Sequence, residues 1–548
     1  MNEINQFSAE NEIRYLLESS KTPDQVEDAS IKILSDKLYA YTLSELESEV
    51  FSQEEKSDFI ATPTEKNNPK LLEENFANWQ EKIANEKELE FVKTLNQQFP
   101  HGRFYLVGGC IRDGYLAKES KDYDLVIAGI APEDLEKALQ DMGKIDLVGK
   151  NFGVYKFASD NHKGLIDIAL PRQEKSTGSG RKKDFEIESN YQLPIDADLS
   201  RRDLTINSMA YDLINNQLVD PFNGKGDLEH GIIKAVGNPQ ERFSEDLSRI
   251  LRAIRFSAKF GFDIEEKTWQ SLTEISPKML IKDEKGQQIV PWETIGVELE
   301  KAFTSNPIKT LDLLNKSGLL SILLPEIDNL KGVEQPKEHH KEGDTYTHTR
   351  LALKALPTYA PTSLVFATLL HDVAKPQTSN LNENGKITFY GHAEKSAEMA
   401  NVICKRLVFT KQMTEKVCAL IQKHMDVFQI EKMSKSTLYK LLFKTLPNNE
   451  TSGELKILNR ADLLASLHSE KDCQDYFRNT VRQFQKENQT QIEPLVNGKD
   501  LISKGLKPGP TFGGILTRVF KQQIEKGVTD RLEALRLLDE LIQNELAV

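Results

Sequence analysis

The chain has 548 residues, of which 39% are hydrophobic and 28% charged, and its formal net charge is −13. This length exceeds what one hydrophobic core serves, so we expect roughly three to five domains. The sequence contains no run of about eighteen apolar residues, so no membrane span is expected. The N-terminus lacks the apolar core of a signal peptide. The bulk acidic charge argues against non-specific nucleic-acid binding.

The first hundred residues carry most of the acidic excess. They hold 21 of the 84 acidic residues and 10 of the 71 basic ones, so the local balance is −11 and the remainder is close to neutral. That remainder can therefore carry local basic patches. Apolar spacing predicts helices over Glu12–Glu18, Val26–Tyr39 and Leu71–Leu95, with a polar linker at Ala61–Lys70. The segment contains no catalytic cluster, and we interpret it as a helical appendage or a partner-binding region.

Strand-like runs alternate with short helical ones from Phe104 to Val219. A helix is predicted over Pro132–Met142, and strands are predicted over Tyr105–Val107, Asp124–Ile127, Tyr155–Phe157, Gly164–Leu170 and Gln217–Val219. This alternation predicts a small mixed α/β domain.

The first strand ends in Gly108-Gly109, and the pair Asp122 and Asp124 lies at the start of the second. Backbone N–H groups in a glycine turn can approach a phosphate chain closely. Residues at i and i+2 of a strand point to one face, so the two carboxylates can hold one or two Mg²⁺ ions that also bind substrate phosphates. Together these features predict nucleotidyl transfer from a nucleoside triphosphate.

Two features follow this carboxylate pair. Asp167 lies inside an apolar strand, where it is either a third metal-site carboxylate or an edge-strand residue that faces water. The stretch Ser176–Asp184 is rich in glycine and serine and carries Arg181-Lys182-Lys183. Its composition predicts a loop, either simply solvated or a flexible element near the polymerising site.

The segment Ser200–Leu213 joins charged residues to an apolar stretch. Asp203 and Asn207 are one helical turn apart, so both can face a ribose while an arginine such as Arg202 contacts phosphates.

A helix is predicted over Phe243–Phe262, with Asp246, Arg249 and Arg252 spaced three apart on one polar face. One interpretation is a surface ladder of ion pairs. The other is a base-reading pair: cytosine and adenine each present an amino donor beside a ring-nitrogen acceptor, which a carboxylate and a guanidinium match. Guanine and uracil present the reverse polarity and would leave buried groups unpaired. The pair can thus select CTP and ATP.

The chain resembles the class II tRNA nucleotidyltransferase and bacterial poly(A) polymerase family, within the polymerase-beta-like superfamily. The resemblance is carried by five motifs in this order: GGxxRD, DxD, RRDLTINSMAYD, DPFNGKGDL and EDLSRILRAIRF. The resemblance runs from about Phe104 to Phe262. It implies template-independent addition of CCA to the 3′ end of tRNA from CTP and ATP, with catalytic Mg²⁺ at Asp122 and Asp124. It also implies nucleotide contacts from the remaining motif residues: Gly108, Gly109, Arg112, Arg202, Asp203, Asn207, Asp246, Arg249, Arg252 and Arg255.

Further along, Gly332–Leu351 resembles the start of the HD domain that many of these enzymes carry, and His371-Asp372 follows in an apolar helix. HD domains are typically metal-dependent phosphohydrolases, although some attached copies are degenerate. Imidazole and carboxylate clusters suit a divalent ion such as Mg²⁺, Mn²⁺ or Ni²⁺. The expected ligands are His348, His371, Asp372, His392, His424 and Asp462.

The expected fold class is α+β, with a small mixed α/β nucleotidyltransferase head followed by mainly α-helical neck, HD and tail domains. The expected bounds are 1–95 for the helical acidic N-terminal extension, which departs from the family, 96–230 for the head, 231–330 for the neck, 331–475 for the HD domain and 476–548 for the tail. In the tail, Lys499, Lys504 and Lys507 either contact RNA backbone or belong to a plain packing unit. The four cysteines lie far apart without a C-x-x-C pair, which is typical of reduced thiols in the cytoplasm.

Three alternatives stay open on sequence alone. A poly(A) polymerase has the same chemistry, but that branch usually lacks the HD domain. An enzyme that adds only CC or only A is poorly distinguished by sequence. An HD phosphohydrolase whose head only binds RNA is a different class, and the intact Asp122 and Asp124 pair argues against it.

Overall fold

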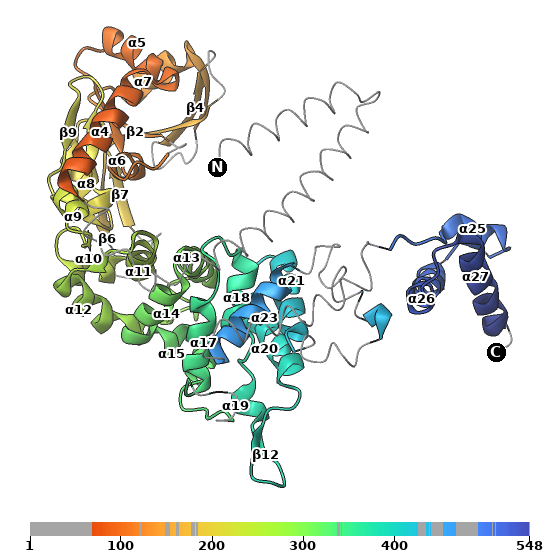
Figure 1. The fold of residues 1–548 in the computed structure, drawn as a ribbon. Helices are drawn as coiled ribbons and strands as arrows, with labels where there is room; N and C mark the ends of the chain where they lie inside the picture. Colours follow the sequence, from red (N-terminus) through yellow and green to blue (C-terminus); the bar gives the residue numbers. More distant parts are fainter. Residues whose placement is uncertain are drawn as a thin grey trace. The chain divides into compact units, whose positions relative to one another are not determined.

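The computed structural model describes residues 68–119, 123–147, 154–159, 164–176, 181, 185–336, 340, 342–425, 434–437, 439, 453–466, 492–506, 508–509 and 511–546. The chain divides into two units, Met1–Lys66 and Asn67–Val548. The first unit, with the helices predicted over Glu12–Glu18 and Val26–Tyr39, lies outside the described residues. The described residues of the second unit are drawn in colour in Figure 1.

A seven-stranded sheet forms the head, in the order β3-β4-β5-β2-β1-β8-β9. β2 and β5 run parallel, and the other neighbouring strands are antiparallel. All five predicted strands are present, whereas β3 and β8 were not predicted. The strands are β1 (Arg103–Val107), β2 (Asp124–Ala128), β3 (Gly143–Leu147), β4 (Val154–Ser159), β5 (Ile166–Ala169), β8 (Ala210–Asp212) and β9 (Gln217–Val219).

A separate hairpin of β6 (Arg172–Ser176) and β7 (Phe185–Ser189) flanks the predicted loop Ser176–Asp184, most of which lies outside the described residues. Helices α6 (Gly109–Tyr115) and α7 (Pro132–Gln140) connect strands of the sheet. Helices α8 (Ile195–Ser200) and α9 (Gly224–Glu229) follow in the second half of the head.

Two helices before the sheet pack into the same apolar core. α4 (Pro69–Ala84) begins with the Asn68 side chain accepting from the backbone N–H of Lys70 and with proline at its first position, both favourable at a helix start. Phe76 of α4 stacks on Tyr115 of α6 with ring centroids 4.1 Å apart. α5 (Glu90–Gln98) adds Phe91, whose ring centroid lies 4.7 Å from that of Phe157 of β4. The helical prediction for residues 71–95 therefore holds, with a short break around residue 85.

The rest of the described chain is almost entirely helical. After the head come α10 (Pro239–Glu245), α11 (Ser248–Phe260), α12 (Glu266–Ile275), α13 (Trp292–Ser305), α14 (Pro307–Lys316), α15 (Leu319–Leu323) and α16 (Pro325–Asp328). Next come α17 (Thr345–Lys354), α18 (Thr362–Leu370), α19 (Lys375–Thr378), the hairpin β12 (Asn380–Leu381) and β13 (Ile387–Thr388), α20 (His392–Arg406), α21 (Lys411–Lys423) and α23 (Gly453–Ser466). The last helices are α25 (Gly498–Ser503), α26 (Thr511–Lys526) and α27 (Arg531–Leu546), which enclose an apolar cluster of their own.

This architecture confirms the predicted fold class for the described part of the chain, a mixed α/β head with a mainly helical remainder (Figure 1). Among the described residues, no helix combines the length and the apolar character that crossing a bilayer requires.

Helices α13 and α20 meet in a close backbone contact. A Cβ atom added to Gly296 of α13 would lie 1.9 Å from the backbone carbonyl oxygen of Leu407, which follows α20. Beside it, Arg406 forms a bidentate ion pair with Glu326 of α16, with N···O distances of 2.6 and 2.7 Å. Its guanidinium also lies 5.4 Å from the Trp292 ring centroid. Glycine at position 296 thus permits an approach that any side chain would prevent.

Candidate functional site

The glycine turn between β1 and α6 has the backbone shape that glycine supplies. Gly108 has φ 78° and ψ −127°, in the positive-φ region that L-residues rarely adopt. A Cβ atom added there would lie 2.8 Å from Nη1 of Arg202. The turn therefore brings a guanidinium group directly against open backbone at the start of α6, which is favourable for a phosphate group.

Asp124 and Asp167 lie side by side in the sheet. They are directly paired residues of the parallel strands β2 and β5, so their side chains project from the same face. β5 lies between β4 and β2, so the edge-strand interpretation of Asp167 is wrong. Lys156 of β4 pairs with Asp167 across the sheet, and its Nζ lies 2.9 Å from Asp167 Oδ1, with 43% and 45% of the two side chains exposed. Asp122 lies outside the described residues.

A buried carboxylate missed in the sequence analysis holds Arg202, which lies beside the glycine turn, together with its neighbour Arg201. Asp198 of α8 is fully buried and accepts from Arg201 at 2.7 and 2.9 Å and from Arg202 at 3.1 Å. Burial raises the pKa of Asp198, but the two guanidinium groups outweigh it, so that this pKa lies below its ordinary value. An acidic residue three and four positions before two arginines was the signal available in the sequence.

The residues predicted to face a ribose belong to one hydrogen-bonded network. Asp203 accepts from Asn207 at 3.2 Å and from Arg252 of α11 at 2.7 Å. The Oδ1 atom of Asn207 in turn accepts from Arg112 of α6. Burial raises the pKa of Asp203, yet the charge and hydrogen bond of Arg252 lower it below its ordinary value. The network therefore holds an ionised carboxylate between α6 and α11.

The helix predicted over Phe243–Phe262 is interrupted at Asp246, so Asp246 and Arg249 do not share one helix. α10 ends at Glu245, and Asp246 has an extended backbone with φ −147° and ψ 102°. Asp246 Oδ1 accepts from the backbone N–H of Ser248 at 2.9 Å and from its hydroxyl at 2.6 Å, which caps the start of α11. This capping bond competes with helical hydrogen bonding and ends the continuous helix.

Despite the interruption, Asp246 and Arg249 lie together and are both buried, at 5% and 6% exposure. Arg249 Nε lies 3.9 Å from Asp246 Oδ2, and Arg249 Nη1 donates to Glu245 at 2.9 Å. Nη2 of Arg249 donates to the backbone carbonyl of Arg201 at 3.2 Å. Burial on this scale rules out the surface-ladder interpretation, because exposed ladders are solvated. Arg255 is separate from this pair and binds Glu298 of α13 at 2.6 Å.

The six residues predicted as HD ligands converge in the HD region, all of them buried or nearly so. His348 Nε2 lies 2.9 Å from Asp462 Oδ1 and 3.7 Å from Asp372 Oδ2. His371 Nε2 lies 3.2 Å from Asp372 Oδ2, a lone pair facing a carboxylate without hydrogen-bonding geometry. On the other side of Asp372, its Oδ1 lies 3.5 Å from His392 Nε2.

The tautomers of three of these histidines are set by backbone carbonyls near helix ends. Nδ1 of His371, His392 and His424 lies 2.8, 2.8 and 2.6 Å from the carbonyl oxygens of Thr368, Phe389 and Ile421. With Nδ1 as the donor, the neutral ring leaves Nε2 unprotonated. Nε2 of His392 and of His424 lie 3.3 Å apart, so two lone pairs face one another. A cation between them removes this repulsion, which fits a metal site.

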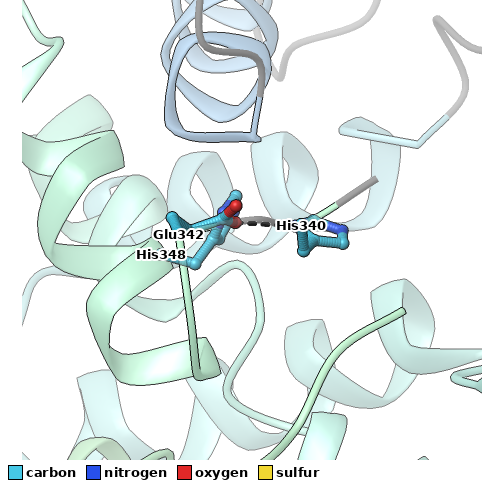
Figure 2. Close-up of side chains that lie close together, drawn as sticks. All are labelled: His340, Glu342 and His348. Atoms are coloured by element: carbon cyan, nitrogen blue, oxygen red, sulfur yellow. Dashed lines mark hydrogen bonds and ion pairs between the residues drawn. The ribbon is translucent and has the colours of Figure 1, made fainter. Parts of the chain in front are cut away.

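A loop carboxylate holds the fourth histidine, as Figure 2 shows. Glu342 Oε1 lies 2.8 Å from Nδ1 of His348 and 2.8 Å from Nδ1 of His340. Burial raises the pKa of Glu342, but these hydrogen bonds outweigh it and lower it to about 2. Burial lowers the pKa of His348, but the hydrogen bonds to Asp462 and Glu342 raise it to about 9. Each ring nitrogen of His348 thus faces a carboxylate oxygen, and without a cation these carboxylates favour a second ring proton, which a divalent cation at Nε2 would displace.

Lys375 and its partner Gln335 in the HD region were not assigned a role in the sequence analysis. Lys375 is 6% exposed, and its Nζ lies 2.7 Å from Asp372 Oδ2 and 2.6 Å from Gln335 Oε1.

The protonation of His424 suits a ligand. Burial, and to a smaller extent the charge of His371, lowers the pKa of His424 to about 4, so His424 is neutral near pH 7 and available as a ligand.

Comparisons with known proteins agree with this arrangement. The family described as "Poly A polymerase head domain" matches residues 104–234, "Probable RNA and SrmB- binding site of polymerase A" matches 261–331, and "HD domain" matches 345–467. The multifunctional CCA protein of Nitrosococcus oceani is 34% identical over 340 residues, which cover 62% of this chain and 78% of that protein. The multifunctional CCA protein of Neisseria gonorrhoeae is 33% identical over 344 residues, covering 62% and 78%.

Solved structures show the same fold. The Bacillus stearothermophilus CCA-adding enzyme in complex with CTP matches with a TM-score of 0.57 at 20% identity, covering 84% of this chain and 98% of that one. The Thermotoga maritima CCA-adding enzyme matches with a TM-score of 0.50 at 22% identity, covering 87% and 97%. The relatives at 33–34% identity, together with the matched head and HD domains, confirm the resemblance drawn from the motifs: the chain belongs to the family of class II CCA-adding tRNA nucleotidyltransferases that carry an HD domain.

Proposed function

We propose that this protein adds C, C and A to the 3′ end of tRNA from CTP and ATP without a nucleic-acid template. The observation that carries the proposal is the buried pair of Asp246 and Arg249 in the same compact unit as the Asp124 and Asp167 row. A carboxylate acceptor beside a guanidinium donor matches cytosine and adenine and leaves guanine and uracil unpaired. The printed names of the relatives, multifunctional CCA proteins, support this substrate class.

In the proposed mechanism, Asp122, Asp124 and Asp167 would hold Mg²⁺, which when bound would supply a lowered pKa for the primer 3′-hydroxyl and positive charge for the leaving pyrophosphate. Residues of the chain position the nucleotide. Gly108 and Gly109 admit the triphosphate against their backbone, with Arg202 beside them. The further nucleotide contacts proposed from the motifs are Arg112, Asp203, Asn207, Arg252 and Arg255.

Lys156 has a specific place in this proposal. Its ammonium group neutralises Asp167 when no Mg²⁺ is bound. Two carboxylates on neighbouring strands repel each other, so a cation beside Asp167 lowers the cost of placing it next to Asp124. The pair is half-exposed, so the lysine can release the carboxylate at little cost when Mg²⁺ binds.

The decisive experiment incubates the purified chain with tRNA that lacks CCA and with each labelled nucleotide, and measures product length on a sequencing gel. Three added nucleotides in the order C, C, A are expected. Products that stop after CC, products with A alone on a CC end, or a long A tail would each replace the proposal by the corresponding alternative. No incorporation, together with hydrolysis of phosphate esters, would favour an RNA-binding HD phosphohydrolase.

For the HD region we propose a metal-dependent phosphohydrolase. His348, His371, Asp372 and Asp462 offer one set of ligand atoms, while Asp372, His392 and His424 offer a second set that shares Asp372. The facing lone pairs at both sets support bound divalent cations, for which Mg²⁺, Mn²⁺ and Ni²⁺ are the candidates. Hydrolysis of 2′,3′-cyclic phosphates and of simple phosphate esters, tested with each ion in turn, is the corresponding assay.

The proposal assigns five segments: an N-terminal extension (1–95), the catalytic head (96–230), the neck (231–330), the HD domain (331–475) and the tail (476–548). A cytoplasmic location goes with a tRNA substrate and with cysteines that form no disulfide: Cys110, Cys404 and Cys418 are free, and Cys473 lies outside the described residues.

A further inference from the structure

His348 differs from the other three HD histidines in where it lies on its helix. His371 and His424 follow the last residues of α18 and α21, and His392 begins α20. Backbone carbonyls at and around helix ends lack intrahelical partners and can accept from Nδ1. His348 lies inside α17, where the carbonyl of Thr345 already accepts from the Thr349 hydroxyl at 2.9 Å. Its Nδ1 therefore needs an acceptor from another part of the chain.

Glu342 supplies that acceptor. Its Oε1 lies 2.8 Å from His348 Nδ1, and only 2% of its side chain is exposed. Its other oxygen, Oε2, is buried and has no hydrogen-bond partner in the described part of the chain. Burying a carboxylate with one unsatisfied oxygen costs stability, so the residue is not explained by packing alone.

The same atoms could in principle hold an ion in the outer cluster of His340, Glu342 and His348, since their ligand atoms lie within 4.8 Å of one another. That arrangement would require His348 Nδ1 to be unprotonated. A neutral imidazole carries one proton, so the ring cannot offer Nδ1 to an outer ion and Nε2 to an inner ion without becoming an anion. Nε2 of His348 faces Asp372 and Asp462, the more highly charged side. The inner site therefore takes the lone pair, and the outer cluster takes the proton.

We propose that Glu342 is a positioning residue of the HD centre, whose carboxylate accepts the Nδ1–H of His348 and thereby presents Nε2 as a ligand for a divalent cation. The inference rests on the proposed phosphohydrolase function and deepens it. Outer carboxylates of this kind fix the ring orientation and raise the basicity of the ligating nitrogen. On the outer side of this pair, Nδ1 of His340 lies 2.8 Å from Glu342 Oε1 and 3.3 Å from the hydroxyl oxygen of Ser466.

The test is Co²⁺ binding to the chelator-stripped full-length protein, followed by the visible absorption of bound Co²⁺ and by calorimetry. Removing the carboxylate in Glu342→Ala is expected to weaken Co²⁺ binding by about 10- to 100-fold. Glu342→Gln keeps an oxygen acceptor and is expected to restore most of the affinity. Glu334→Gln, an exposed glutamate before the same loop, is the matched control and should bind Co²⁺ like the wild type.

CCA incorporation by the same preparations reports whether each variant is folded, since Glu342 lies outside the proposed polymerising site. Wild-type Co²⁺ affinity in a folded Glu342→Ala variant would overturn this inference and leave the phosphohydrolase proposal intact. Equal weakening in Glu342→Gln and Glu342→Ala would also overturn it, because hydrogen-bond acceptance would then not be the cause. Failure of the wild type itself to bind any divalent ion in the HD region would overturn the phosphohydrolase proposal and this inference together.

Discussion

Gly296→Ala tests the close packing between α13 and the end of α20. The new Cβ atom would lie 1.9 Å from the carbonyl oxygen of Leu407, whereas carbon and oxygen approach to about 3.3 Å at the closest. The two backbones must therefore separate by roughly 1.4 Å. Because the obstacle is backbone rather than the end of a flexible side chain, we expect a cost of about 3 kcal/mol, near the upper end for overpacking.

Alanine also gains about 1 kcal/mol over glycine inside a helix, which leaves a net loss of about 2 kcal/mol. For a domain of 150 to 250 residues this corresponds to a fall in melting temperature of roughly 4–8 °C. Differential scanning calorimetry of the full chain measures it. Gly513→Ala is the matched control, because Gly513 lies in α26 and a Cβ atom there meets nothing within 4 Å. An unchanged Gly296→Ala transition, or equal shifts in the two variants, would refute the argument.

The remaining predictions concern the two candidate centres and one buried ion pair. Asp124→Ala should abolish nucleotide incorporation while tRNA binding measured by filter retention survives, and near-normal incorporation would contradict the metal assignment. Arg249→Ala should lose the preference for CTP and ATP over GTP and UTP in single-nucleotide incorporation, so that unchanged selectivity would speak against base reading. His371→Ala should remove phosphate-ester hydrolysis and leave CCA addition within about twofold; parallel loss of both in folded protein would contradict two separate centres. Asp198→Asn should lower stability by about 3 kcal/mol at pH 7 by leaving two arginines without their carboxylate. Since the folded pKa of Asp198 is depressed, the stability it adds is present above about pH 4 and is lost as the pH falls through the folded pKa. The gap between wild-type and Asp198→Asn melting temperatures should therefore close in acid, and a constant gap would exclude the electrostatic explanation.

Local patterns predicted five strands of the head sheet and the helices near residues 71–95, 132–142 and 243–262, because the information for these elements lies within a few residues. Strand-like runs located β4 and β5, and the glycine turn located the end of β1, whereas α6 was not predicted. The pairing of Asp124 with Asp167 depends on which strand lies beside β2, and a parallel neighbour reached by a long crossover leaves no local signal. The break at Asp246 was missed because apolar spacing continues on both sides of it, while the capping bond to Ser248 that ends the helix was not considered.

The residues of the candidate sites also fall into two groups, those predicted from the sequence and those that only the fold reveals. The resemblance to HD domains predicted the six HD residues, and the structure brings all of them together. Sequence patterns did not bring out Glu342 or Lys156, whose roles exist only relative to partners in the folded chain. Asp122 stays a prediction from its spacing to Asp124.

The proposed sites of chemistry and of base choice are physically connected by hydrogen bonds between α11 and α6. The proposed base-reading residue Arg249 donates to the backbone of Arg201, and Arg252, one turn later on α11, binds Asp203. Asp203 binds Asn207, and Asn207 binds Arg112 on the helix that starts at the glycine turn. α11 and α6 are thus joined by buried, charge-assisted hydrogen bonds rather than by apolar contact alone. Such bonds are strongly directional, so we expect a displacement of α11 to shift the segment 201–207, which lies between the proposed base-reading pair and the glycine turn. A nucleotide whose base does not fit Asp246 and Arg249 would therefore also misplace its phosphates relative to Asp124, which makes selection act on the rate of transfer as well as on binding.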